Sequence, residues 1–169
     1  MAQFDNNRFS SAKQEWETPQ ELFDGLNKRY NFKFDLAADT TNNKCANYFS
    51  LCHGDALEFK WKGNCWLNPP YGGAGANRLA NWVEKAYNES KTGDCIVTML
   101  IPARTNTRWW HEYCMKATEV LFINGRPKFG GAAYGLPQPL AVVTFSSAKT
   151  RAKFGTYNIK DNTIDMPIV

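Results

Sequence analysis

The segment from Ile96 to Ile101 is an almost unbroken apolar run that Pro102 closes. A strand with one face in water alternates between apolar and polar residues, whereas a strand buried on both faces reads as a continuous apolar run. Such strands are typical of parallel sheets whose two faces are covered by helices. We therefore expect residues 96–101 to form an interior strand of such a sheet.

Helical patterns precede and follow this run. Thr18 is expected to cap a first helix, with Pro19 at its first position and Glu21 completing a capping box. A second helix begins near Leu79 and ends at Lys91-Thr92-Gly93. The apolar residues of the first helix fall on one face at helical spacing: Leu22, Phe23, Leu26 and Tyr30.

Short apolar segments alternate with these helices. Trp109, Trp110 and Tyr113 indicate a further helix, in which the tryptophan pair is better read as core than as a stacking platform. The tail from Arg151 is expected to add an edge strand or to hang free. The other predicted strands are residues 32–37, 65–67, 120–123 and 140–145.

This alternation predicts an α/β fold with a mostly parallel central sheet and flanking helices. Residues 1–15 are expected to be a flexible arm and residues 16–169 a single domain. In open sheets of this kind, ligands bind outside the carboxyl ends of the strands. Asp35, Asn68, Pro102 and Gly125 end or follow predicted strands, so we expect them to converge on one edge.

Composition limits the classes of function. The chain has five cysteines at scattered spacing and two histidines, so we expect reduced thiols and no metal site. No apolar run is long enough to span a membrane and no signal peptide is apparent, which predicts a cytoplasmic protein. The net charge of +4 is compatible with a polyanionic partner.

The tetrapeptide Asn68-Pro69-Pro70-Tyr71 carries the most specific chemistry. An exocyclic amino group of a nucleobase is a poor nucleophile because its lone pair is delocalised into the ring. An asparagine oxygen and the carbonyl of the next residue can accept its two hydrogens and free the lone pair. Proline at that next residue fixes φ and removes a competing N–H. The ring of Tyr71 is suited to stacking on a base that has left the DNA stack.

The chain resembles the amino methyltransferase superfamily, whose catalytic motif is (D/N/S)PPY. It is most similar to the phage-type DNA N6-adenine methyltransferase (Dam) family. Besides the NPPY motif, the resemblance rests on further blocks in the family's order, over residues 15–146: Trp16-Glu17-Thr18-Pro19, Phe34-Asp35-Leu36-Ala37-Ala38, Trp66-Leu67, Ile101-Pro102-Ala103 and Gly125-Arg126-Pro127-Lys128-Phe129.

The resemblance implies a Rossmann-like fold and methyl transfer from S-adenosylmethionine to adenine N6 in double-stranded DNA. Asn68 and Pro69, supported by Pro70, would bind the target amino group, and Tyr71 would stack on the flipped base. No cysteine would act as a nucleophile. The residues expected at the cofactor are Trp16, Thr18, Pro19, Asp35, Ala37, Ala38, Asp55 and Asn68.

One departure from related methyltransferases concerns the loop after the first strand. Many of them have a glycine-rich loop there, whereas this chain reads Asp35-Leu36-Ala37-Ala38-Asp39. Small alanines could still allow the cofactor to approach. The polar stretch that follows leaves little room for a helix.

Recognition of DNA is expected to come from short loops, because no separate target-recognition domain fits in 169 residues. The enzyme would act as a monomer or a homodimer. The basic residues near the expected active edge are candidates for contacts with phosphates or base edges: Arg78, Arg104, Arg108, Arg126 and Lys128.

Two alternatives remain compatible with the residues. The NPPY motif would also suit another planar amino group, such as cytosine N4, an RNA base or a protein glutamine. A DNA-binding module without catalytic activity would suit the basic and aromatic composition.

Overall fold

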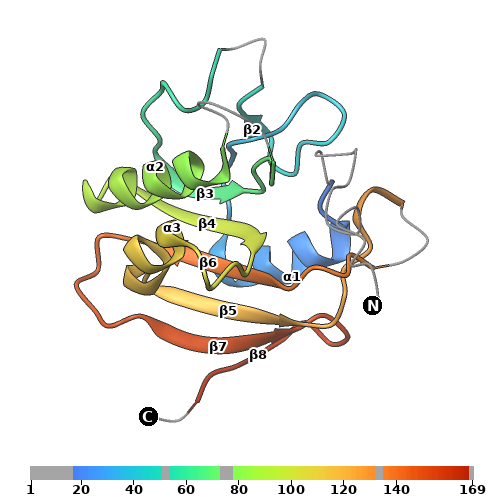
Figure 1. Cartoon of the computed structure of the whole chain (residues 1–169). Helices are drawn as coiled ribbons and strands as arrows, with labels where there is room; N and C mark the ends of the chain where they lie inside the picture. The colour runs from blue at the N-terminus through green and yellow to red at the C-terminus, as the bar shows by residue number, and fades with distance from the viewer. Residues whose placement is uncertain (1–16, 51–53, 73–77, 132–134, 168–169) are drawn as a thin grey trace, which may run out of the picture.

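One eight-stranded sheet organises the fold, with the strand order β2-β1-β3-β4-β6-β5-β7-β8 (Figure 1). The computed structural model describes residues 17–50, 54–72, 78–131 and 135–167. Strands β2, β1, β3, β4, β5 and β7 run in one direction, and β6 and β8 run in the other. The strands are β1 (Phe34–Asp35), β2 (Asn47–Tyr48), β3 (Gly63–Leu67), β4 (Cys95–Pro102), β5 (Glu119–Asn124), β6 (Leu140–Phe145), β7 (Lys153–Asn158) and β8 (Thr163–Asp165).

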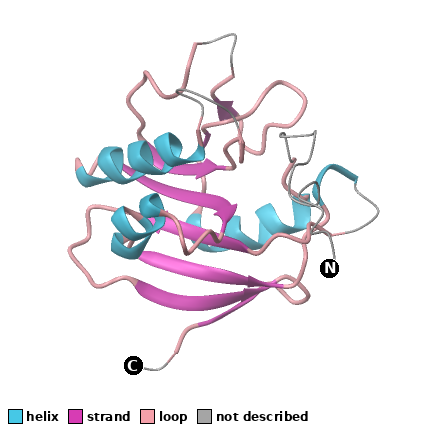
Figure 2. Ribbon diagram, viewed as in Figure 1, coloured by secondary structure: helices cyan, strands magenta, loops and turns pink. Residues whose placement is uncertain are grey.

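Helices cover both faces of the sheet (Figure 2). Helix α1 (Gln20–Tyr30) packs on one face, while α2 (Leu79–Lys91) and α3 (Arg108–Glu112) pack on the other. The expected α/β fold with a mostly parallel sheet is confirmed. The described residues also form the short 3-10 helices η4 (Cys114–Lys116) and η5 (Phe129–Gly131).

The two apolar layers explain the continuous run in β4. Val97, Met99 and Ile101 belong to the layer under α2, whereas Leu100 belongs to the layer under α1. Thr98 is also buried, and its hydroxyl forms a 3.1 Å hydrogen bond with the hydroxyl of Thr144 on β6. Strand β4 is thus an interior strand covered on both sides from Val97 to Pro102, as the sequence predicted, whereas Ile96 near its start is 40% exposed.

The start of α1 differs from the expected capping box. The helix begins at Gln20, Pro19 occupies the N-cap position, and no side chain caps the helix. Thr18 is only 3% exposed, so its side chain is buried instead of bonding the first turn. The prediction of Thr18 as the cap was wrong. The predicted apolar face is correct, because Leu22, Phe23 and Leu26 are buried.

Three other segments differ in extent. The strand expected over residues 32–37 is limited to Phe34–Asp35, and the last ladder bond to β3 runs from the N–H of Leu36 to the carbonyl of Trp66. The helix expected near Trp109 ends at Glu112 and continues as η4. The tail does not hang free, since it forms β7 and the edge strand β8.

The described residues include no helix long and apolar enough to cross a membrane. They also include no cluster of three metal-ligating side chains. Cys45, Cys65, Cys95 and Cys114 are free and buried. Burial raises the pKa of Cys65 to about 12, so its thiol stays protonated at neutral pH.

Candidate active site

The carboxyl ends of β1, β3, β4 and β5 lie at one edge of the sheet, because these strands run in the same direction. Asp35 ends β1, Asn68 follows β3, Pro102 ends β4 and Gly125 follows β5. The structure thus brings to one edge the four residues that were expected to converge there. We call this region the active edge.

Asn68 begins the loop directly after β3, between the ends of β1 and β4. Its side-chain oxygen is buried although the residue as a whole is half-buried. The carbonyl of Pro69 accepts no hydrogen bond from any residue that the structure describes. This loop therefore offers a backbone acceptor that no described residue uses, next to an asparagine side chain.

Tyr71 fixes the far end of this tetrapeptide. Its hydroxyl donates a 3.2 Å hydrogen bond to the carbonyl of Leu100 on β4. Its ring is 6% exposed and packs in the apolar layer that also contains Trp66, and burial raises the pKa of its hydroxyl. In this structure the ring anchors the loop to the sheet, and little of its face is open to a base.

Asp35 organises the loop that follows β1. Its carboxylate accepts hydrogen bonds from the backbone N–H of Ala37 at 3.3 Å and of Lys44 at 3.0 Å. Burial raises the pKa of Asp35 to about 6, although the two backbone donors and the charge of Lys44 act in the opposite direction. Asp35 is 3% exposed, and its buried carboxylate joins the two ends of the ten-residue segment from Asp35 to Lys44.

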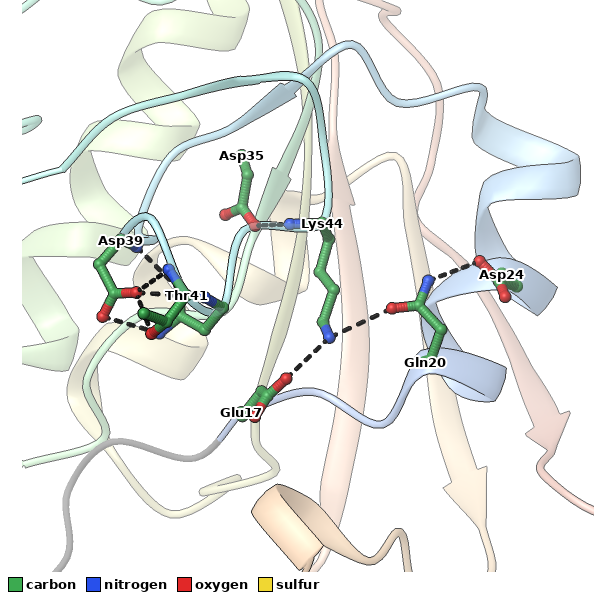
Figure 3. A network of polar contacts seen from close by, with 8 residues as sticks. Glu17, Gln20, Asp24, Asp35, Asp39, Thr41 and Lys44 are labelled. Atoms are coloured by element: carbon green, nitrogen blue, oxygen red, sulfur yellow. Dashed lines mark hydrogen bonds and ion pairs between the residues drawn. The ribbon is translucent and has the colours of Figure 1, made fainter.

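Lys44 joins this loop to the segment before α1 (Figure 3). Its ammonium group lies 3.2 Å from a carboxylate oxygen of Glu17 and 3.3 Å from the amide oxygen of Gln20. Gln20 in turn donates to Asp24 at 2.8 Å. The side chain of Lys44 is only 8% exposed, whereas that of Glu17 is 48% exposed.

Lys44 was not predicted from the sequence. A lysine in a polar loop has the pattern of a solvated surface residue, and its partners lie more than twenty positions away. Only the fold shows that one residue contacts both segments expected at the cofactor. The same region is further tied together because the N–H of Gly130, after β5, donates to the carbonyl of Glu17.

Of the other predicted cofactor residues, Thr18 adjoins Glu17 in the chain, and Ala37 and Ala38 follow Asp35. Thr18 is buried, and Ala37 and Ala38 are half-buried, with the N–H of Ala38 bonded to Phe49 at 3.1 Å. Asp55 lies on the connection between β2 and β3, where its carboxylate accepts from the N–H of Leu57 at 2.9 Å. Trp16 and the glycine loop at 73–75 lie outside the described residues.

The five predicted DNA-binding residues all lie on the segments that leave the active edge. Arg78 precedes α2, Arg104 and Arg108 follow β4, and Arg126 and Lys128 follow β5. All five are exposed. Arg108 forms an ion pair with Glu112 at 2.6 Å. This side of the molecule therefore presents a set of cations around the loop of Asn68.

Comparisons with known proteins agree with this geometry. The sequence model of the DNA N-6-adenine-methyltransferase (Dam) family matches residues 5–154. The DNA N-6-adenine-methyltransferase of Haemophilus phage HP1 is 32% identical over 128 residues, which cover 73% of this chain and 70% of the relative. That of Escherichia phage T1 is 33% identical over 111 residues, covering 64% of this chain and 44% of the relative.

A solved structure supports the fold alone. A modification subunit assigned to a type I restriction enzyme of Vibrio vulnificus YJ016 superposes with a TM-score of 0.55 at 12% identity. The match covers 90% of this chain and 48% of that one. The sheet with its helices is thus a Rossmann-like fold. From the family match, the two phage relatives and this fold together, the chain belongs to the DNA N-6-adenine-methyltransferase (Dam) family and is a DNA adenine methyltransferase.

Proposed function

We propose that this enzyme transfers a methyl group from S-adenosylmethionine to N6 of an adenine that has been flipped out of double-stranded DNA. The observation that carries the proposal is the loop of Asn68 to Tyr71, which follows β3 at the active edge and is anchored to β4 by the Tyr71 hydroxyl. Acting on DNA, the enzyme would work in the cytoplasm of a bacterium or of a phage-infected host.

The catalytic step needs two acceptors for the two hydrogens of the amino group. The side-chain oxygen of Asn68 and the carbonyl of Pro69 are adjacent along the chain and can fill these two roles. The uncommitted carbonyl of Pro69 supports this assignment. Two preorganised acceptors would draw the amino nitrogen towards a tetrahedral shape and make its lone pair available for attack.

The flipped base needs a site that holds its ring. Tyr71 remains our candidate for stacking, although its ring is largely covered in this structure. The neighbouring prolines restrict the backbone of the loop, so a base that enters would meet acceptors already in place. Asn68 and Pro69 therefore orient the amino group, and Tyr71 holds their loop against β4.

Residues after β1, before α1 and between β2 and β3 fit a cofactor with an adenosine and an amino-acid end. Asp55 has a half-buried carboxylate, Ala37 and Ala38 allow close approach of a ligand, and Glu17 and Lys44 present opposite charges. When bound, S-adenosylmethionine supplies an electrophilic methyl group on a sulfonium. We propose that Thr18 and Pro19, with Trp16 beside them in the chain, border its methionine end, and that the Lys44 contacts hold this wall against the loop of Asp35.

DNA would approach the active edge, where the exposed cations can bind phosphates. Arg104 and Arg126 have no carboxylate within ion-pair distance among the described residues. Arg108 forms an ion pair with Glu112, so it would have to break this ion pair in order to bind a phosphate. Arg78 and Lys128 would add phosphate contacts on either side of the Asn68 loop.

A transfer assay with labelled S-adenosylmethionine and unmethylated duplex DNA, followed by mass analysis of the nucleosides, tests the proposal. We expect N6-methyladenine, and its loss in Asn68→Ala. If the product were N4-methylcytosine, or if only RNA or a protein were methylated, the target amino group would be one of these and not adenine N6 in DNA. If the protein neither transferred a methyl group nor bound S-adenosylmethionine, it would be a DNA-binding module without catalytic activity.

A further inference from the structure

A second site lies at the edge of the sheet opposite to the active edge. It is a cavity of about 420 Å³ that is lined by α2, by η4 and by the loop that follows β6. Strand β6 starts at Leu140, opposite Pro102, and ends at Phe145, opposite Val97. The five residue steps from Val97 to Pro102 place this cavity about 17 Å along the strands from the active edge.

The charge of the cavity is of one sign. Its lining contains the three exposed lysines Lys91, Lys116 and Lys149, and it contains no Asp or Glu. Among the described residues, none of these lysines has a carboxylate within ion-pair distance. The cavity therefore holds positive charge that the fold does not neutralise.

Two of these lysines gather on one aromatic ring. The ammonium of Lys91 lies 3.9 Å from the ring centroid of Tyr87, and that of Lys116 lies 6.0 Å from it. The ring attracts each cation, but two like charges near one ring repel each other. An anion between them would turn this repulsion into two favourable interactions.

Hydroxyl groups complete the lining. The Ser146 hydroxyl is used within the fold, since it bonds Thr118 at 2.7 Å and accepts the N–H of Ala148 at 3.3 Å. The hydroxyls of Ser147 and Thr150 form no hydrogen bond with any other residue in the described ranges. Lysine ammonium groups and free hydroxyls are the donors that phosphate oxygens accept from.

We propose that this cavity binds a phosphate group, carried either by a small free phosphate compound or by the backbone of a DNA segment other than the one at the active edge. The inference does not depend on the methyl-transfer proposal, because none of the lining residues belongs to the active edge. Three lysines without acidic neighbours suit a group of charge near −2 better than a carboxylate.

The test compares two variants with equal changes in charge. The cavity variant combines Lys91→Gln, Lys116→Gln and Lys149→Gln. The control variant combines Lys28→Gln, Lys62→Gln and Lys160→Gln, which are exposed lysines outside the cavity lining. The first probe is inorganic phosphate at constant ionic strength, followed through the amide resonances of Ser147 to Thr150. The second probe is a fluorescent DNA duplex titrated at several salt concentrations.

We expect saturable phosphate-dependent shifts in the parent and the control, and their loss in the cavity variant. If the natural source is DNA, the salt dependence of duplex binding also falls in the cavity variant, by about 0.9 in slope for each lost phosphate contact. If the source is a free phosphate compound, both variants show the same DNA slope. Phosphate-dependent shifts that persist in the cavity variant would overturn the proposal. It would also be overturned if the parent showed no saturable shifts and its duplex binding had the same salt dependence as that of the cavity variant.

Methyl transfer by the cavity variant at saturating DNA separates this inference from the proposed function. We expect it to match the control. A parent protein that binds phosphate in the cavity but never methylates DNA would refute the proposed function and leave this inference standing.

Discussion

The loop after β3 and the loop after β1 end neighbouring strands of the same sheet, yet they are held in different ways. The loop of Asn68 to Tyr71 is restricted by two adjacent prolines and by one hydrogen bond from Tyr71 to β4. The loop from Leu36 to Cys45 has no proline or glycine and is held by polar contacts of Asp35 and Lys44. The two prolines fix the backbone of the loop that would hold the amino nitrogen of the target base. Hydrogen bonds and an ion pair instead hold the loop that would border the cofactor.

The largest effect is expected at the first loop. Asn68→Ala removes one of the two acceptors for the target amino group and should lower kcat by about 10² to 10³. Single-turnover methyl transfer at saturating S-adenosylmethionine measures this directly, with Asn64→Ala as a control on the same strand. An Asn68→Ala enzyme with normal kcat but weak cofactor binding would contradict the role given to Asn68.

Asp35 should leave a signature in the pH dependence of stability. Its pKa is raised from 3.8 to about 6 in the folded protein, so the folded state holds the proton more tightly than the unfolded state. The contribution of Asp35 to stability is therefore highest below pH 3.8 and falls as pH rises towards 6, by about 3 kcal/mol in all.

Urea unfolding of the parent and of Asp35→Asn between pH 4 and pH 7 isolates this contribution. Asparagine carries no charge at any of these pH values, so the difference in unfolding free energy between the two proteins should change across this range. Parallel pH profiles would show that Asp35 is not buried as its geometry indicates.

Lys44→Met should weaken the cofactor more than the chemistry. The substitution keeps an unbranched chain of similar length but removes the ammonium group that bonds Glu17 and Gln20. We expect KM for S-adenosylmethionine to rise about tenfold, which corresponds to 1.4 kcal/mol. Lys44→Arg should restore most of the affinity, because it keeps the charge. Equal losses in both variants would point to loop packing as the cause.

Tyr71→Phe tests the anchor of the first loop. It removes one hydrogen bond and leaves the carbonyl of Leu100 without that donor, which should cost about 1 kcal/mol of unfolding free energy. Thermal unfolding with Tyr87→Phe as the comparison measures this cost, because the Tyr87 hydroxyl has no hydrogen bond with any described residue. A destabilisation no greater than that of the control would remove the anchoring role.

The smallest effect is expected at the cysteines. Cys65 lies in β3 only three residues before Asn68, but its thiol is fully buried and protonated. Cys65→Ala should therefore change kcat less than twofold while lowering stability modestly through the volume removed. Loss of activity at unchanged cofactor affinity would argue for a covalent role of this thiol.

The two loops also show how far the sequence could be read. Local patterns in the sequence predicted the strand at residues 96–101 and the helix at residues 79–91. The four residues that end or follow strands also lie at one edge of the sheet, as expected. The NPPY motif could be found because its chemistry lies in adjacent residues. Lys44 could not, because its role comes from contacts with Glu17 and Gln20 that exist only once α1 packs on the sheet.

Thr18 shows the same limit at a helix end. Its side chain was a good local candidate for a cap, but burial against the core was the stronger demand. The ring of Tyr71 shows what packing adds, since it lies in the same buried apolar layer as Trp66, while its role in stacking on a base stays a prediction. Local structure was predicted correctly where neighbours in the chain decide it, and incompletely where tertiary packing decides it.

The division of work between the two loops is tested by measuring kcat and the Kd for S-adenosylmethionine of Asn68→Ala and Lys44→Met side by side. We predict that Asn68→Ala loses kcat by about 10² to 10³ with Kd nearly unchanged, whereas Lys44→Met raises Kd about tenfold with kcat nearly unchanged at saturation. If both variants lost kcat and affinity in the same proportion, the division of work between the two loops would be wrong.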